Sequence, residues 1–399
     1  MKNGYLSQYF KGVTAKILSG VEANPERSNQ HEFNGTVRMK TLFGTARKTF
    51  DTRFIYLDDD NDPIVDNGFL TWYDARENHP TRSEYRLFFK STTVSQAAST
   101  GDTLFIALRP DDTVLVIIAA ANSTISSQLV WLFGIQVDSQ FAVVTGLDSN
   151  GNRLEFASKL ILEQIGIDVD EGNTDYLDEM IHRFGGKFPQ TRAFSEFARS
   201  TLNGLNIQDD PDGVLLSWLE REEKLFKTLE KHLIQQRLAE GFVDVDAFIS
   251  YSLSVQNRRK SRVGLALENH FEVVLQEYGI QYDRTKVTEN RSKPDFIFPG
   301  IQQYHDADFP VDKLTMLGSK STCKDRWRQV LAEADRIDHK HLLTLEAAIS
   351  THQTDEMKDK KLQLVIPEAI HKTYTAAQQS WLWDVKSLLA MLLEKQASL

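Results

Sequence analysis

The chain has 399 residues, and 46 Lys and Arg against 56 Asp and Glu give it a formal net charge of −10 at pH 7. This balance argues against a protein that coats nucleic acid without sequence preference, because phosphate binding depends on clustered cations. The single cysteine, Cys323, excludes an intrachain disulfide and a multi-cysteine zinc site, so a metal would need oxygen or histidine ligands.

Length and hydropathy predict a protein of two domains that does not enter the membrane. A chain of this length exceeds what one hydrophobic core usually organises, so two domains of roughly 150 to 200 residues are expected. The sequence has no apolar run of about 18 residues, and its start, "MKNGYLSQYFKG", lacks the apolar core of a signal peptide. We therefore expect a cytoplasmic protein without a membrane partner.

The first part of the chain has the pattern of strands. The segment "TLFIALRPDDTVLVIIAA" has two apolar runs around a Pro-Asp-Asp turn, which predicts a hairpin. Before it, "GFLTWYDARENHPTRSEYRLFF" alternates arginines and a histidine with tyrosines. This segment is either a half-buried pair of surface strands or a surface that contacts DNA or an effector.

From about residue 155 the pattern becomes helical. The segments "FSEFARSTLNGL" and "VLLSWLEREEKLFKTLEKHLIQQRLAEGF" carry apolar residues at helical spacing. The joint between domains is expected in residues 150–190, at "NTDYLDEMIHRFGGKFPQ" with its Gly-Gly and Pro. We therefore expect a β-rich domain over residues 1–185 and a second domain over residues 186–399.

Helices and strands alternate in the last part of the chain. Helices are expected in "VDAFISYSLSV", "RVGLALENHFEVVLQEYG", "CKDRWRQVLAEADRI" and "SWLWDVKSLLAMLLEKQ". Short buried strands are expected in "PDFIFPG", "LTMLGSK", "HLLTLEA" and "KLQLVIP". This order predicts an α/β domain in which helices flank a mixed sheet.

Two strand ends and a helix of this domain carry residues suited to phosphodiester hydrolysis. Asp295 opens the strand in "KPDFIF", Lys320 ends the next strand, and Glu333 is expected on the third turn of the following helix, directed toward the strand ends. Two carboxylates can hold Mg²⁺, which activates water, and a lysine can orient that water or offset charge on the phosphate. Spacing alone still favours a structural role for such a trio.

A basic cluster precedes this trio. The segment "NRRKSR" packs four cations into six residues. They are either the solvated start of a helix or contacts to DNA phosphates, which would form a basic cleft on an otherwise acidic protein. The residues concerned are Arg258, Arg259, Lys260 and Arg262.

From Phe242 to its end, the chain resembles the catalytic domain of the EcoRII-type restriction endonucleases, which belong to the PD-(D/E)XK nuclease superfamily. The resemblance rests on several blocks in the same order: "SVQNRRKSR", Leu267 with Glu268, "KPDFIFP", "YHDADFP", "KSTCKDRWRQVLAEADRI" and "HLLTLE". It implies a PD-(D/E)XK core for this domain and favours phosphate contacts for the basic cluster.

Carried over residue by residue, the resemblance assigns roles to the candidate site. Asp295 is the metal-binding acid, Lys320 the catalytic lysine, Glu333 the second metal-binding acid and Glu268 an additional carboxylate of the active site. The acid that usually stands two residues before the lysine is here Gly318, and Glu333 replaces it, as in this branch of the superfamily. The segment that reads the CC:GG part of the target corresponds to Lys324, Asp325 and Arg326, and Arg can pair with guanine while Asp can accept from cytosine.

The resemblance implies a Mg²⁺-dependent type II restriction endonuclease. Its substrate would be double-stranded DNA with a palindromic CC…GG site of the CCWGG or CCNGG kind, with or without flanking bases. A homodimer is expected because two-fold symmetry matches a palindrome. A cognate DNA methyltransferase is implied as a functional rather than a physical partner.

The N-terminal part resembles the same region of other EcoRII-type enzymes through "FKGVTAKILSGVEANPERSNQHEFNG" and the aromatic-rich segment. The family implies a B3-like DNA-binding barrel there, which could bind a second copy of the target or extend the recognised sequence. Two other functions stay open: a repair-type or modification-dependent nuclease, and a catalytically silent DNA-binding protein on the same fold.

Overall fold

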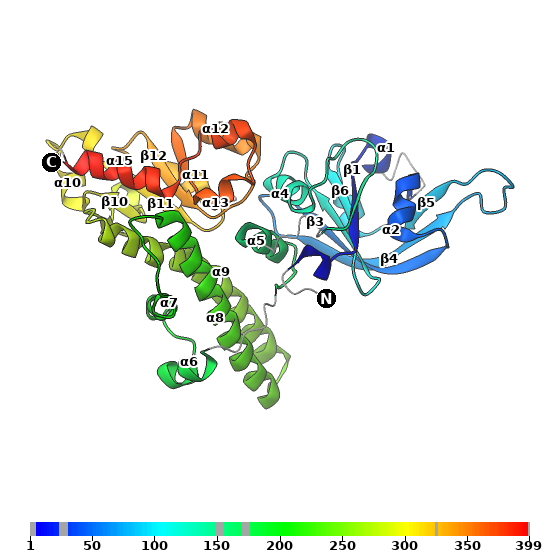
Figure 1. Cartoon of the computed structure of the whole chain (residues 1–399), viewed down its shortest axis with the longest axis horizontal. Coiled ribbons are helices and arrows are strands. Elements are labelled where there is room, and N and C mark those ends of the chain that lie inside the picture. Colours follow the sequence, from blue (N-terminus) through cyan, green and yellow to red (C-terminus); the bar gives the residue numbers. More distant parts are fainter. Residues whose placement is uncertain (1–4, 24–30, 148–154, 170–175, 324–325, 398–399) are drawn as a thin grey trace. The chain divides into compact units, whose positions relative to one another are not determined.

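The structure is a computed structural model that describes residues 5–23, 31–147, 155–169, 176–323 and 326–397. The chain forms two compact units (Figure 1): Met1–Val169 with Ala347–Thr354, and Asp170–Glu346 with Asp355–Leu399. The sequence predicted two separately folding domains, with the division between residues 185 and 186. The compact units do not test separate folding, so this division stays a prediction.

In the first unit, eight strands form one sheet in the order β2-β5-β4-β3-β7-β6-β1-β8. The β3–β7 pair is parallel, whereas the other pairs of this sheet are antiparallel. The strands are β1 Gly12–Ile17, β2 Glu32–Asn34, β3 Lys48–Leu57, β4 Ile64–Asp74, β5 Tyr85–Phe89, β6 Thr103–Leu108, β7 Val114–Ala119 and β8 Ala142–Thr145. A β-rich first unit is therefore present, and its likeness to a B3 barrel stays a prediction.

Strands β6 and β7 confirm the predicted hairpin. They pair antiparallel with Thr103 opposite Ala119, and Asp112 in the turn between them has a positive φ of 63°. Every residue of both strands is buried. Because both faces of these strands are covered, the two segments are continuously apolar instead of alternating.

The aromatic-rich segment forms β4 and β5, which pair antiparallel. Leu70, Trp72, Leu87 and Phe89 point into the core of the unit, and the residues between them are at least partly exposed. The half-buried pair of strands is thus confirmed, and a contact of its outer face with DNA stays a prediction.

Short helices accompany the first sheet. They are α1 Gly20–Ala23, α2 Lys40–Phe43, α3 Thr93–Ala97, α4 Thr124–Phe133 and α5 Phe156–Gln164, with 3-10 turns at Leu6–Gln8 and Val37–Met39.

The second unit contains a five-stranded sheet in the order β13-β12-β11-β10-β9. Strands β11, β12 and β13 are parallel, and β9 and β10 are antiparallel to their neighbours. The strands are β9 Asp283–Arg284, β10 Phe296–Phe298, β11 Thr315–Lys320, β12 Lys340–Thr344 and β13 Leu362–Val365. The predicted mixed α/β sheet with flanking helices is confirmed.

Helices of very different length accompany this sheet, and α6 and α7 lie beside the long helices rather than against the strands (Figure 1). The longest are α8 Pro211–Glu240 and α9 Val245–Glu277, which pack against each other, and α9 also contacts β11. The others are α6 Leu177–Phe184, α7 Thr191–Ser200, α10 Ile301–His305, α11 Arg326–Leu331, α12 Thr351–Asp359, α13 Glu368–His371, α14 Ala376–Gln379 and α15 Val385–Ala397, with 3-10 turns at Glu289–Arg291 and Val311–Lys313.

Helix α9 differs from the prediction, which had two separate helices in its place. Asp244 caps its start by accepting a hydrogen bond from the Ala247 amide at 2.7 Å. The residues between the two expected helices include no proline or glycine to interrupt them, and ion pairs to α8 stabilise this stretch. One continuous helix therefore carries both the basic cluster and Glu268.

Within the described ranges, none of the helices has the length and apolar character needed to cross a membrane.

Candidate active site

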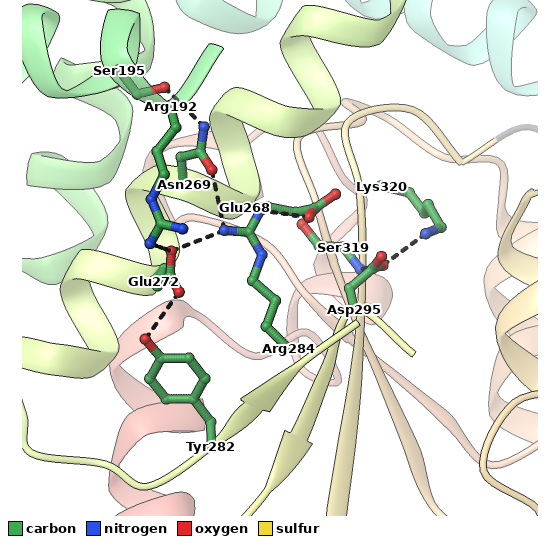
Figure 2. A network of polar contacts seen from close by, with 10 residues as sticks. All are labelled: Arg192, Ser195, Glu268, Asn269, Glu272, Tyr282, Arg284, Asp295, Ser319 and Lys320. Atoms are coloured by element: carbon green, nitrogen blue, oxygen red, sulfur yellow. Dashed lines mark hydrogen bonds and ion pairs between the residues drawn. The ribbon is translucent and has the colours of Figure 1, made fainter. Parts of the chain in front are cut away.

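The structure brings Asp295 and Lys320 together, as expected for residues at one edge of a sheet. Strands β10 and β11 pair antiparallel, which places Asp295, just before β10, beside the end of β11. Asp295 Oδ2 accepts hydrogen bonds from the Ser319 amide at 2.6 Å and from Lys320 Nζ at 2.7 Å (Figure 2). The two side chains are 13% and 20% exposed, so the pair is shielded but still open to solvent.

Glu268 approaches this pair from α9. Its Oε2 accepts a hydrogen bond from Arg284 Nη2 at 2.7 Å (Figure 2). Burial raises the pKa of Glu268, and the negative charge of Asp295 adds to the rise, whereas the cations Arg284 and Lys320 oppose it. The charges that act on Glu268 therefore include both members of the Asp295–Lys320 pair.

Glu333 lies near the same pair, although its position in the chain differs from the prediction. Helix α11 ends at Leu331, so Glu333 lies in a bend beyond the helix and not on its third turn. Ala334 next to it has a positive φ of 51°, and Lys340 Nζ donates to the Leu331 carbonyl at 2.5 Å, which closes the end of the helix. This turn directs the carboxylate, in place of the longer helix that was expected.

The Glu333 carboxyl group is not satisfied by the described parts of the chain. Burial raises its pKa, Asp295 raises it further, and Lys320 and Lys340 oppose the rise. Its Oε2 atom is buried, and among the described residues it has no hydrogen-bond partner. A buried carboxylate oxygen without a donor is costly unless a cation binds it.

Gly318 explains why the usual second acid is absent from β11. A Cβ atom built on Gly318 would lie 2.7 Å from Cγ2 and 3.1 Å from Cγ1 of Val330 on α11. Helix α11 thus packs where the side chain of an acid at this position would begin. A side chain at this position would have to displace Val330, and Glu333 follows shortly after the same helix.

The side chains fit a small hard cation. Asp295 and Glu333 offer carboxylate oxygens only, and Asp295 accepts the hydrogen bonds from Ser319 and Lys320 on Oδ2. In the described ranges, no group of three or more Asp, Glu, His or Cys side chains is placed to hold a metal ion. Mg²⁺ commonly takes one or two carboxylates and completes its shell with water and phosphate oxygens. An orphaned oxygen on Glu333 beside Asp295 agrees with such a site.

Comparison with known proteins agrees with this geometry. Residues 226–389 match the family described as EcoRII C terminal. Over 207 residues, the chain is 41% identical to the type II restriction enzyme EcoRII of Escherichia coli. This alignment covers 52% of this chain and 51% of that enzyme. The chain spans about half the length of the curated relative that it matches.

Two solved structures are also similar to the chain. Metal-depleted Ecl18kI in complex with uncleaved, modified DNA is 18% identical, with 56% of this chain and 84% of that chain covered and a TM-score of 0.47. The PspGI–substrate DNA complex is 15% identical, with 60% and 96% covered and a TM-score of 0.41. Scores this low support no inference about this chain.

The segment that was expected to read bases, residues 324–326, lies only partly within the described residues. Lys324 and Asp325 lie outside the described residues. Arg326 is the first residue of α11, and its side chain is exposed. Cys323 and Trp327 on either side are buried, and burial raises the pKa of the Cys323 thiol.

The basic cluster on α9 is not a uniform row of exposed cations. Arg262 is only 6% exposed, and its guanidinium pairs with Glu223 and, at 3.3 Å, with Glu222 on α8. This differs from the surface position expected of a phosphate contact, because two carboxylates of α8 attract the side chain inward. Arg262 also lies over the Phe226 ring, with 4.1 Å between guanidinium and centroid.

The other three cations of the cluster are more accessible. Arg259 Nη2 lies 2.5 Å from the buried Glu230 carboxylate, yet half of the Arg259 side chain is exposed. Arg258 stacks 3.8 Å from the centroid of Phe188, and Lys260 is exposed. Arg259 and Lys260 are therefore exposed, Arg258 is half-buried against Phe188, and Arg262 joins α8 to α9.

Sequence reasoning missed Arg284 and Lys340. Arg284 lies in the two-residue strand β9 and bonds Glu268, which precedes it by 16 positions. Lys340 opens β12 and stabilises the turn that carries Glu333. Neither residue stands in a motif with a recognisable spacing, so no signal in the sequence pointed to them.

Proposed function

We propose that the chain is a type II restriction endonuclease that makes Mg²⁺-dependent double-strand cuts in DNA at a CC…GG site of the CCWGG or CCNGG kind. The observation that carries the proposal is the Asp295–Lys320 pair at the edge of the sheet, with the unsatisfied Glu333 carboxylate beside it. The EcoRII C-terminal family of residues 226–389 supports the same conclusion.

In the proposed reaction, Asp295 and Glu333 hold the metal. When bound, Mg²⁺ supplies charge stabilisation on the scissile phosphate and lowers the pKa of a water molecule. The Lys320 ammonium lies beside Asp295, one of the proposed metal ligands. There it offsets negative charge on the phosphate or orients the attacking water. Glu268 supplies a further carboxylate, and the products are 5′-phosphate and 3′-hydroxyl ends.

Recognition is assigned to the start of α11. Lys324, Asp325 and Arg326 are proposed to read the CC:GG part of the site. The exposure of Arg326 supports a bidentate contact to guanine O6 and N7, while an aspartate can accept a hydrogen bond from cytosine N4. Phosphate contacts are assigned to Arg258, Arg259 and Lys260, and less readily to the buried Arg262.

The first unit is proposed to bind DNA or to act as an effector module. The outer face of β4 supports this, because Arg47 lies over the ring of Tyr73, which places a cation beside an aromatic ring. A B3-like barrel in this unit is part of the proposal.

The proposed partners follow from the proposed substrate. A palindromic duplex calls for a homodimer in which each subunit cuts one strand. A cognate DNA methyltransferase would protect host DNA without binding this chain, and the proposed place of action is the cytoplasm.

Digestion of phage DNA with the purified chain and Mg²⁺, followed by sequencing of the ends, tests the proposal. Cuts at one fixed CC…GG sequence in unmodified DNA are expected. Cuts that require modified or damaged bases would favour the modification-dependent or repair-type nuclease instead. Sequence-specific binding with no cleavage in any divalent metal would leave a silent DNA-binding protein.

A further inference from the structure

The Arg284 guanidinium is the centre of a polar network that borders the candidate active site (Figure 2). Its Nη2 donates to Glu268 Oε2 at 2.7 Å, and its Nη1 donates to Glu272 Oε2 at 2.9 Å and to Asn269 Oδ1 at 3.1 Å. All three acceptors lie on α9, whereas Arg284 lies on β9. One side chain therefore joins the helix that carries Glu268 to the sheet.

The backbone of Arg284 is placed by the strand that follows Asp295. Arg284 pairs with Phe296 in the β9–β10 ladder, and the Thr285 amide donates to the Asp295 carbonyl at 3.1 Å. The pairing of β9 with β10 therefore fixes the positions of both Arg284 and Asp295. A shift of Arg284 would move Glu268 relative to Asp295.

The network extends away from the site through Glu272. Arg192 on α7 donates to Glu272 Oε2 at 2.8 Å, and the Tyr282 hydroxyl donates to Glu272 Oε1 at 3.2 Å. Asn269 Nδ2 donates to Ser195 Oγ at 3.2 Å. Glu272 and Asn269 are thus each held by a partner besides Arg284, and Arg192 is the most exposed of these partners, so its bond adds least to the network.

We propose that Arg284 is a positioning residue of the cleavage site, which holds the Glu268 carboxylate beside Asp295 and Lys320 and keeps it from binding the metal. This inference rests on the proposed function. A carboxylate oxygen bonded to a guanidinium gives a divalent cation a poor ligand, because the two cations repel each other. Metal binding is then left to Asp295 and Glu333, while Glu268 acts as a fixed charge that attracts Lys320 and limits its orientations.

The first test measures metal affinity in the full-length protein without DNA, by calorimetric titration with Mn²⁺. Glu268→Gln should leave the Kd nearly unchanged, because Glu268 is not a ligand. Arg284→Met should tighten Mn²⁺ binding several-fold, because it frees a carboxylate and removes a neighbouring positive charge. A loss of affinity of about tenfold in Glu268→Gln, as expected for a ligand or its direct support, would overturn the proposal.

The second test is a double-mutant cycle on the single-turnover cleavage rate at saturating Mg²⁺. Arg284→Met should slow cleavage about tenfold or more, as outer-shell partners commonly do. It should cause no further slowing in the Glu268→Gln background, because Arg284 acts through Glu268. Equal slowing in both backgrounds would mean a general structural role and would refute the inference.

Arg192→Met is the matched control. Arg192 bonds the same Glu272 oxygen, which lies on the side of the network away from Glu268, and its side chain is 71% exposed. Its rate and Mn²⁺ affinity should equal those of the wild type. If Arg284→Met does not fold, the Mn²⁺ affinity of Glu268→Gln still decides. A wild-type chain that cuts no DNA would instead refute the proposed function, and the Mn²⁺ titrations would still test the role of Arg284.

Discussion

The contact between Gly318 and Val330 makes a quantitative prediction about both stability and catalysis. In Gly318→Ala, the new Cβ would lie 2.7 Å from Val330 Cγ2 and 3.1 Å from Cγ1, closer than carbon atoms can pack. Overpacking of this kind costs about 1 to 3 kcal/mol. Replacing glycine within a strand recovers about 0.5 to 1 kcal/mol of that cost. The free energy of unfolding of the second unit should therefore fall by about 1 kcal/mol, and by at most about 2.5 kcal/mol.

The assay combines thermal unfolding with the cleavage rate. For a unit of this size, each kcal/mol lowers Tm by about 2 to 4 °C. Cleavage should slow as well, because α11 must move outward, and it carries Arg326 at its start and leads into Glu333 at its end. The control is Gly318→Ala combined with Val330→Ala, which removes the two methyl groups in conflict.

The double variant should show coupling of about 1 kcal/mol or more between the two positions. If Gly318→Ala alone unfolds at the wild-type temperature and cleaves at the wild-type rate, α11 does not occupy the place of the missing acid. The explanation given for the position of Glu333 would then be wrong.

Three further predictions concern catalysis, recognition and pH. Asp295→Ala and Lys320→Ala should abolish cleavage but leave specific binding measurable by gel shift, since they contact metal and water; a normal rate in either would contradict their roles. Arg326→Ala should lose about 1 to 3 kcal/mol of discrimination between CC…GG and a mismatched site. Lys260→Ala should instead weaken binding to all sequences and lower the salt slope by about one; uniform losses in both would disprove base reading by Arg326. Burial raises the pKa of Asp212 from 3.8 to about 6, so the stabilising protonated form is lost as pH rises through that value, at a cost of about 2 to 3 kcal/mol between pH 4 and pH 7. Asp212→Asn should lack this pH-dependent loss of the free energy of unfolding, measured from urea unfolding curves. The same dependence of that free energy on pH in both proteins would refute the role of Asp212.

Several features could be predicted because they depend on residues close together in the chain. The β6–β7 hairpin follows from two apolar runs around one turn, and Asp295 with Lys320 follows from two neighbouring strands that meet at one edge. Local periodicity and turn chemistry carry this information, so the sequence alone was sufficient.

Other features depended on contacts between segments far apart in the chain. The pull of Glu222 and Glu223 on Arg262, and the bond from Arg284 to Glu268, join residues that no motif links. The exact end of α11, and with it the place of Glu333, depends on Lys340 from a later strand. Sequence determined which residues can do the chemistry, whereas tertiary packing decided which charges are buried against each other. The reason is physical. Desolvation and ion pairing depend on which groups are close in space, and they produce no periodic pattern in the sequence.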